Sequence, residues 1–283
     1  MEKLVLIGTS SLAAQTVAFI ERYQLFDIIG FTINEQYMKE TSFMGKPVYP
    51  IERLEEYVDK ETVKVFCTAS WYNHMNRLRK KLFDELKAKD FKFANLISPN
   101  SLVYTDDLGE GNWIHDFAHI GHGVRIGNNN VFRMNCVIGH DSVIGNHNFF
   151  GVASVIGGHD YYGDCNFTGL RALVFNRVAI GNKCIVGAGS ALKDDLPDYS
   201  LCVAPKSFIK QCDEEKIESY ITPAHLNRSV DEFNKMIKAN EKGENYWFLL
   251  ISATILKISR SERSFIIVFQ KPFLKATTIC LAC

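Results

Sequence analysis

The spacing of hydrophobic residues changes once along this chain, near Pro99. Before that point, short apolar runs alternate with segments whose apolar residues recur every three or four positions. Such runs predict strands, and such spacing predicts amphipathic helices. We expect strands over residues 3–7, 27–33, 63–68 and 91–97, and helices over residues 12–23 and 73–87. Alternating strands and helices indicate a small parallel α/β domain of Rossmann-like type over residues 1–96.

After Pro99 the apolar residues follow a period of six. Starting at Leu108, every sixth residue is apolar through fifteen repeats, except Thr168. In eleven of these repeats the next residue is glycine, so one phase of the pattern holds eleven of the chain's 19 glycines. A six-residue repeat fits one short strand and one corner, with the apolar side chain inside and glycine relieving strain at the turn. Residues 97–207 are therefore expected to form a β-helix in which each coil is covered by its neighbours.

The six-residue pattern stops after Lys206. Helical spacing recurs over residues 213–220 and 229–241, while residues 246–283 are apolar and basic with no clear period. We describe residues 208–283 as a C-terminal helical extension that ends in an unassigned tail.

Composition and charge narrow the classes of partner. The chain is 47% hydrophobic and 23% charged, with a formal net charge of +0, so nothing favours nucleic acid as a ligand. Its longest apolar run, residues 246–256, is shorter than the ~20 residues that a membrane span needs. The N-terminus lacks a signal-peptide pattern, and the eight cysteines are scattered. We therefore expect a cytoplasmic protein with free thiols, no membrane span and no nucleic-acid partner.

The repeat sequence LGEGNW-IHDFAH-IGHGVR-IGNNNV resembles the hexapeptide-repeat acyltransferases. This resemblance implies a left-handed parallel β-helix with three hexads per coil, and homotrimers whose active sites lie between subunits. The segments FTINEQYMKE, GKPVYP, VIGHDSVIGNH and VGAGSALKDDLPDY, in that order, look like the NeuD-like sugar acyltransferases, which include sialic acid O-acetyltransferase and PglD-related types. Over residues 4–207 the resemblance implies acetyl-CoA as co-substrate and a sugar or nucleotide sugar as acceptor. It also implies a role in bacterial surface-polysaccharide or glycoconjugate synthesis.

In this family the catalytic base is a histidine followed by an acidic residue, in a motif of the type I-x-H-[DE]-x-x-I-G. The matching sequence IGHDSVIG makes His140 the base and Asp141 its acidic neighbour. An imidazole with the reference pKa of about 6.5 is suited to taking a proton from a sugar hydroxyl or amine. Gly158 lies three hexads, or one coil, after His140, and matches the family position at the acetyl-CoA thioester. His122 lies one coil before His140, and we expect it to line the same cleft.

The acceptor sugar is expected to contact residues of the first domain and two residues of the β-helix, His122 and Arg133. Gly8 and Ser10 belong to the first strand-to-helix turn, where a helix N-terminus favours anions, and Asn34 follows the second strand. Arg133 stands seven positions before His140, where the amino-sugar N-acetyltransferases carry asparagine. This departure favours a different acceptor group, such as a hydroxyl.

The acyl-CoA region of the family is matched near the end of the β-helix. Ala188 lies in the corner sequence GAGS, and Lys206 lies in the segment CVAPKS, where its ammonium group would meet phosphates.

Several alternatives remain open at this stage. The acceptor is alternatively an amino group, which would make the protein an N-acetyltransferase of a UDP- or dTDP-linked amino sugar. A non-catalytic β-helix that serves as an assembly or binding subunit is the alternative of another class. No metal is expected, because neither the three histidines at 115, 119 and 122 nor the pair Cys280 and Cys283 completes a zinc motif. The second His-Asp pair, His159-Asp160, is out of phase with the first and is interpreted as a surface corner.

Overall fold

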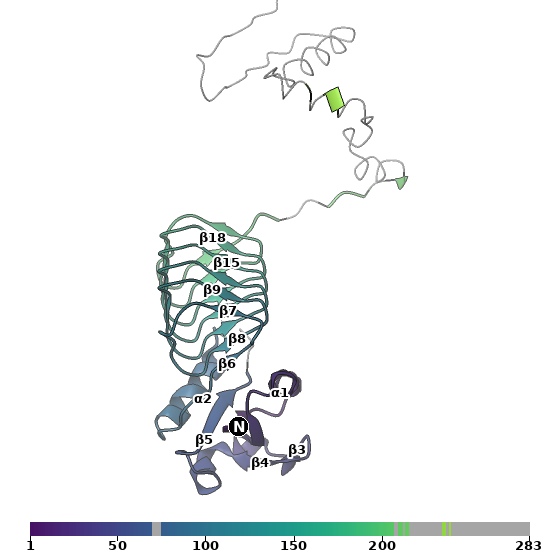
Figure 1. The fold of residues 1–283 in the computed structure, drawn as a ribbon, viewed down its shortest axis with the longest axis vertical. Coiled ribbons are helices and arrows are strands. Elements are labelled where there is room, and N and C mark those ends of the chain that lie inside the picture. Colours follow the sequence, from purple (N-terminus) through teal and green to yellow (C-terminus); the bar gives the residue numbers. More distant parts are fainter. Residues whose placement is uncertain (70–74, 207–208, 212, 215–233, 236–237, 239–283) are drawn as a thin grey trace, which may run out of the picture. The chain divides into compact units, whose positions relative to one another are not determined.

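The computed structural model describes residues 1–69, 75–206, 209–211, 213–214, 234–235 and 238 (Figure 1). The chain divides into one compact unit of residues 1–207 and a second of residues 208–283. The helices expected over residues 213–220 and 229–241 fall mostly outside the described residues, and the tail from residue 246 falls wholly outside them. In the described part of the chain, no helix is both long and apolar enough to cross a membrane.

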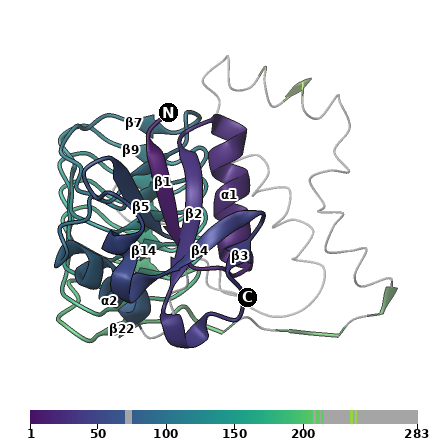
Figure 2. The same ribbon diagram turned by 90° about the horizontal axis from the view of Figure 1, so that it is seen from below.

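The first part of the chain is an α/β domain built on one five-stranded sheet. Its strands lie in the order β3-β4-β2-β1-β5, and all neighbours are parallel except β3 and β4. The elements are β1 (Lys3–Ile7), α1 (Ser11–Tyr23), β2 (Asp27–Ile33), β3 (Ser42–Phe43), β4 (Lys46–Pro50), β5 (Val63–Cys67) and α2 (Arg77–Lys87), with 3-10 turns at Glu35–Tyr37 and Ile51–Glu56. Figure 2 shows α1 running alongside this sheet.

Five of the six elements expected here are present, and one expectation was wrong. The segment 91–97 is not a strand of this sheet: it contributes only a bridge from Phe93 to Val65. Its last residues, Leu96–Ile97, form β6, which pairs with the β-helix instead. The expected domain boundary after residue 96 therefore falls inside a strand. The hydrophobic run was read correctly as extended chain, but its partner is set by long-range packing that a local pattern does not contain.

The repeat region is a three-sided parallel β-helix in which each coil takes up three hexads. Val137, for example, pairs with Val155, which is the equivalent position three hexads later. Each side is one sheet, which we name after an early strand. The β8 face is β6, β8 (Trp113–Ile114), β11 (Val131–Phe132), β14 (Phe149–Phe150), β17 (Phe167–Thr168), β20 (Ile185–Val186) and β22 (Leu201–Cys202). The β9 face is β7 (Leu102–Val103), β9 (His119–Ile120), β12 (Val137–Ile138), β15 (Val155–Ile156), β18 (Leu173–Val174) and β21 (Ala191–Leu192). The β10 face is β10 (Arg125–Ile126), β13 (Val143–Ile144), β16 (Tyr161–Tyr162) and β19 (Ala179–Ile180).

The residues at the six-residue period form the core of this β-helix. From Ile114 to Leu192 they are buried and pack as one cluster, with Thr168 also enclosed. The hydroxyl of Tyr162 lies 3.5 Å from that of Thr168, so the one polar member of the series has a polar neighbour. The parallel sheets and the register of three hexads per coil are consistent with the left-handed β-helix that the sequence resemblance implies.

Stacked asparagines fix the register at the corners between the β10 and β8 faces. The Oδ1 atom of Asn130 accepts the backbone N–H of Asn148 at 2.8 Å, and its Nδ2 atom donates to the carbonyl of Gly145 at 2.9 Å. Asn112, Asn148 and Asn166 repeat the same bonds in adjacent coils. These bonds satisfy buried backbone groups that a corner would otherwise leave unpaired.

The α/β domain packs against the outside of the β8 face. Leu4 and Phe31 of its sheet belong to one buried cluster with Trp113 and Val131, whose side chains point outward from that face. Among the described residues, the corners between the β9 and β10 faces do not take part in this buried cluster. Those corners carry the candidate catalytic histidine.

Candidate active site

His140 and Asp141 lie in the corner between β12 and β13, and they form a hydrogen-bonded pair. The distance from Nδ1 of His140 to Oδ2 of Asp141 is 2.8 Å, and the two side chains are 61% and 54% exposed. Asp141 has a φ of +57°, and its backbone N–H donates to the carbonyl of His122 in the preceding coil. The turn therefore folds the carboxylate back toward the imidazole beside it.

The pairing defines which nitrogen of His140 can act as a base. A carboxylate only accepts hydrogen bonds, so Nδ1 carries the proton in this contact and Nε2 presents a lone pair. The hydrogen bond from His140 also holds the pKa of Asp141 below its usual value. The charged carboxylate can in turn stabilise an imidazolium formed when Nε2 takes a proton.

Two glycines in the neighbouring coils make room for this pair. A Cβ on Gly158 would lie 2.8 Å from Nε2 of His140, and a Cβ on Gly123 would collide with Oδ1 of Asp141. Gly158 is therefore brought directly to the base, as its position in the repeat predicts. Its backbone N–H, however, donates to Oδ1 of Asn176 at 3.0 Å, so it is not free to bind an oxyanion in this structure.

The structure adds His159 to the pair. Its Nε2 atom lies 3.9 Å from Oδ2 of Asp141, and its ring meets the His140 ring edge-on, with centroids 4.9 Å apart at 83°. His159 is an exposed corner residue, as expected, but its place beside the catalytic pair was missed. It is out of phase with His140 and in phase with Asp141, one coil later, and this second relationship is the signal that would have placed it.

These three side chains are also of the types that can bind a metal ion. Their ligand atoms lie within 4.8 Å of one another, and they are two imidazoles and a carboxylate. In this structure the Nδ1 atom of His140 and the Oδ2 atom of Asp141 are joined by a direct hydrogen bond of 2.8 Å.

His122 lies on the same column of corners, one coil before His140. Its ring is exposed and packs at a tilt against Tyr104, with centroids 4.7 Å apart and planes 34° apart. The carbonyl of His122 accepts the N–H of Asp141, which ties the two corners together. His122 therefore lies next to His140 and Asp141, as its position in the repeat predicts.

Arg133 lies on a different corner, between β11 and β12. Its Nη1 atom is 3.0 Å from Nε2 of His115, and its guanidinium sits 6.0 Å from the centre of the Trp113 ring. Because arginine only donates, His115 must accept through an unprotonated Nε2. Burial and the nearby Arg133 charge lower the pKa of His115 to about 3, which keeps it neutral. No carboxylate among the described residues forms an ion pair with the half-buried guanidinium, and burial lowers the pKa of Arg133.

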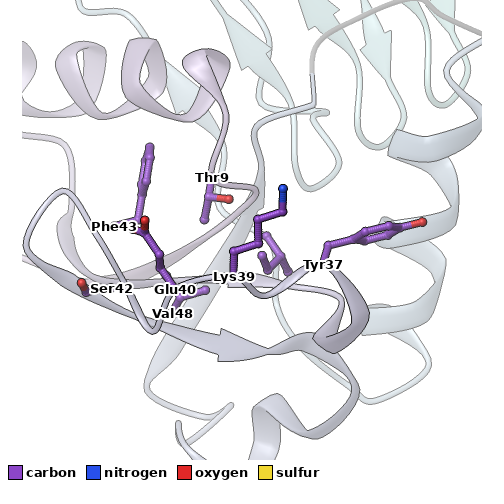
Figure 3. Close-up of a pocket in the computed structure, with 8 residues that line it drawn as sticks. Thr9, Tyr37, Lys39, Glu40, Ser42, Phe43 and Val48 are labelled. Carbon is purple, nitrogen blue, oxygen red and sulfur yellow. The ribbon is translucent and has the colours of Figure 1, made fainter.

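A pocket of about 300 Å³ opens in the α/β domain beside the turn from β1 to α1 (Figure 3). Its lining comes from the ends of β1 and β2 and from the segment that follows β2: Thr9, Ile33, Tyr37, Lys39, Glu40, Ser42, Phe43 and Val48. In Figure 3 the Lys39 side chain extends on the same side as the Thr9 hydroxyl. A hydroxyl and an ammonium group near a helix N-terminus suit an anionic ligand.

Gly8, Ser10 and Asn34 flank this pocket without lining it. Gly8 has a φ of +118°, and a Cβ there would lie 2.6 Å from the Thr68 hydroxyl oxygen, so the turn requires glycine. Ser10 is the N-cap of α1 and accepts the N–H of Leu12 at 3.3 Å. Nδ2 of Asn34 donates to Glu52. All three shape the polypeptide around the pocket, but Ser10 and Asn34 already have partners within the protein.

Within one chain the pocket and the catalytic corner are separate. The described residues that line the pocket all belong to the α/β domain, which packs on the β8 face. His140 lies where the β9 face turns into the β10 face. The two residues expected in the acyl-CoA region near the end of the β-helix also lie apart from the His140 corner. Ala188 is exposed in the corner between β20 and β21, and Lys206 is exposed after β22.

The repeats match a known family model, and the fold matches solved structures. Residues 108–140 match the family model described as bacterial transferase hexapeptide (six repeats). A search of curated proteins gives no match to the chain.

Solved structures align over 71% of the chain. PerB from Caulobacter crescentus, in complex with CoA and GDP-perosamine, is 26% identical, with a TM-score of 0.59 and 93% of its own chain covered. The acetyltransferase domain of PglB from Neisseria gonorrhoeae, in complex with acetyl coenzyme A, is 19% identical, with a TM-score of 0.60 and 95% covered. WeeI from Acinetobacter baumannii is 18% identical, with a TM-score of 0.61 and 96% covered. The last two matches show a shared fold.

Proposed function

We propose that this chain, an acyltransferase built on hexapeptide repeats, transfers an acetyl group from acetyl-CoA to a hydroxyl or amino group of a nucleotide-linked sugar. The observation that carries the proposal is the exposed His140-Asp141 pair, whose free Nε2 atom lies beside Gly158. PerB, which shares the fold, was solved with CoA and a nucleotide sugar, and the PglB domain with acetyl coenzyme A.

The proposed reaction requires little beyond this pair. The acceptor oxygen or nitrogen attacks the thioester carbonyl carbon while Nε2 of His140 takes the proton, and Asp141 stabilises the imidazolium. The tetrahedral intermediate then collapses, the C–S bond breaks, and the CoA thiolate takes the proton back from His140. Gly158 could donate its N–H to the oxyanion once the exposed Asn176 side chain turns away from it.

We assign the nucleotide part of the acceptor to the pocket of the α/β domain, which we regard as Rossmann-like. Thr9 and Lys39 line it beside the N-terminus of α1, where a diphosphate is favoured by the helix dipole. Gly8, Ser10 and Asn34 act there by shaping the surrounding loops.

Because the pocket and His140 lie on different sides of one chain, we propose that a homotrimer completes the site. The pocket of one subunit would then face His140 of the next. The outward side chains of the β9 face support a further contact, because Leu102, Val155 and Leu173 are 53%, 39% and 39% exposed. Acetyl-CoA would run along the later coils, past Ala188, with its phosphates near Lys206.

Arg133 is the residue that we assign to the acceptor sugar itself. Its guanidinium is half-buried and has no carboxylate partner in the described part of the protein, so an anionic group of the substrate would pair with it favourably. His122 would line the acceptor side of the cleft. Acetyl-CoA and nucleotide sugars are both cytoplasmic metabolites, which is where we place the reaction, in surface-polysaccharide or glycoconjugate synthesis.

The test is direct. The full chain is incubated with acetyl-CoA and matched pairs of nucleotide sugars that differ only in carrying an amino or a hydroxyl group at one carbon. Release of the CoA thiol and a mass increase of the sugar support the proposal, and the pair that reacts decides between N- and O-acetylation. His140→Ala should lower the rate by roughly 10²- to 10⁴-fold, the usual contribution of a general base. Thiol release from no pair, with no thermal shift on adding CoA, would favour a non-catalytic β-helix.

A further inference from the structure

We propose that His159 is a positioning residue that controls the catalytic pair through Asp141. While His159 is neutral, the Asp141 carboxylate stays with His140. When His159 is protonated, it draws that carboxylate toward itself and His140 loses its partner. The inference rests on the proposed function, because it assigns His140 as the base.

The distances indicate that both imidazoles can interact with the Asp141 carboxylate, and that His140 is the closer of the two. Oδ2 of Asp141 is 2.8 Å from Nδ1 of His140 and 3.9 Å from Nε2 of His159. The shorter separation is a hydrogen bond, whereas the longer one is too long for a hydrogen bond but within ion-pair distance if His159 is charged. A small rotation of an exposed carboxylate would reverse the two distances.

The backbone holds the three groups in place. Asp141 and His159 occupy equivalent positions in successive coils, with φ of +57° and +60°. The N–H of His159 donates to the carbonyl of His140 at 2.9 Å. Gly123, one coil before Asp141, has no side chain that would block the carboxylate. The arrangement therefore follows from the corner geometry and does not depend on flexible side chains alone.

The other charged groups near His159 leave Asp141 as its main partner. Asp160 follows it in sequence but is 1% exposed, and burial raises the pKa of its carboxyl group. Oδ1 of Asp160 also accepts the N–H of Val178. Arg177 lies one coil further, and its backbone N–H donates to the carbonyl of Gly158. His140 itself faces the His159 ring edge-on.

The consequence concerns the number of protons that inactivate the enzyme. Transfer requires a neutral His140 with Asp141 bound to it, so protonation of either imidazole removes the active form. The active form then requires both imidazoles to be neutral, so two protons are involved on the acidic side of the pH profile. The rate should fall by about 100-fold per pH unit at low pH, against about 10-fold when only one group is required.

The experiment compares kcat/KM from pH 5 to pH 8 for the wild type, His159→Gln and His119→Gln. His119 on β9 has its ring 5.6 Å from that of Tyr104 and does not belong to the His140-Asp141 pair. It serves as the matched control. On the acidic side of the profile, we expect the slope of log kcat/KM against pH to fall from two in the wild type to one in His159→Gln. In His119→Gln it should remain two. At pH 8 the rate of His159→Gln should stay within about twofold of the wild type. Equal slopes in wild type and His159→Gln, or a loss at pH 8 as large as that of His140→Ala, would overturn the proposal.

A second measurement keeps this inference separate from the proposed function. The ring proton signals of His140 are followed by NMR during a pH titration of the full chain without substrates. We expect two coupled steps in the wild type and a single step in His159→Gln. If no sugar is acetylated but the coupling is present, the proposed function fails and the link through Asp141 stands. A single unaltered step in both proteins would refute the link whatever the activity.

Discussion

Gly158 provides the space that the His140 imidazole occupies. A Cβ built on Gly158 would lie 2.8 Å from Nε2 and 3.1 Å from both Cδ2 and Cε1 of that ring. These three ring atoms are its nearest neighbours, and Gly158 has no left-handed φ, so alanine at this position would strain mainly the histidine.

We therefore expect Gly158→Ala to disable the base without unfolding the β-helix. The exposed imidazole can turn away from the new methyl group, which costs little stability but moves Nε2 from the acceptor. A displacement of about 1 Å lowers rates by roughly 100-fold, and kcat should fall by that order. Steady-state kinetics and thermal unfolding of the same preparation measure the two effects.

The control is the same substitution without the histidine. In a His140→Ala background, Gly158→Ala should change neither the residual rate nor the unfolding temperature, because the atoms that collide are gone. A similar loss of rate in that background would mean that Gly158 acts through acetyl-CoA and not through His140.

Lys39 tests the assignment of the nucleotide pocket. Its ammonium group reaches the pocket beside Thr9, and we expect Lys39→Gln to raise KM for the nucleotide sugar while kcat changes little. Added salt should raise the wild-type KM and have less effect on the variant, because screening weakens the same attraction. Lys46→Gln, on β4 outside the pocket lining, is the matched control and should leave KM unaltered. An unchanged KM in Lys39→Gln would place the nucleotide elsewhere.

The sequence predicted the repeats and the proximity of His140, Asp141 and Gly158, for a physical reason. A β-helix repeats its backbone once per coil, every three hexads, so spacing alone brings His122, His140 and Gly158 onto one column of corners. The same rule would have found His159, had it been counted from Asp141. The rule could not show that the N–H of Gly158 is taken by Asn176, because this depends on a side-chain rotamer.

The contacts between the two parts of unit 1–207 were the harder feature to predict. The run 91–97 has ordinary strand character, and only the folded chain shows that Leu96–Ile97 pairs with Trp113–Ile114. Lys39 and Arg79 likewise carry no periodic signal. They gain their roles from the packing of segments that are distant in sequence, which a local hydrophobic pattern does not encode.

Arg79 of α2 joins the α/β domain to the β-helix. Its side chain is 1% exposed. Its guanidinium donates to the carbonyls of Cys67 at the end of β5, of Ala69 just after it, and of Gly111 and Asn129 in the β-helix. Burial lowers the pKa of this arginine. Arg79→Met would leave buried carbonyls unpaired, and we expect a loss of about 3 kcal/mol in the free energy of unfolding.

Urea unfolding measures that loss, and the same helix provides the comparison. Arg77→Met lies two positions earlier at an exposed site and should change stability by less than about 0.5 kcal/mol. If Arg79→Met were equally mild, water would have to satisfy the carbonyls that the guanidinium now binds.

Two buried histidines predict how stability depends on pH. Burial, with the nearby Lys80 charge, lowers the pKa of His147 to about 4, and burial with Arg133 lowers that of His115 to about 3. In the unfolded chain both would titrate near the usual 6.5. Below pH 6.5 the unfolded state takes up protons that the folded state does not bind. The contribution of these histidines to the free energy of unfolding is therefore fully present above about pH 6.5, and it is lost as the pH decreases toward 4. Each histidine should contribute about 1.4 kcal/mol per pH unit within this window.

The variant His147→Gln isolates one of these contributions. Nδ1 of His147 lies 2.9 Å from Nδ2 of Asn129, and glutamine can replace this contact without titrating. We expect the variant to lose less stability than the wild type between pH 6.5 and pH 4.5, although its stability at pH 7.5 is lower. Urea unfolding at four pH values in that range gives both slopes, and groups that titrate elsewhere cancel in the difference. Parallel curves would mean that His147 is protonated in the folded protein, which its buried hydrogen bond from Asn129 argues against.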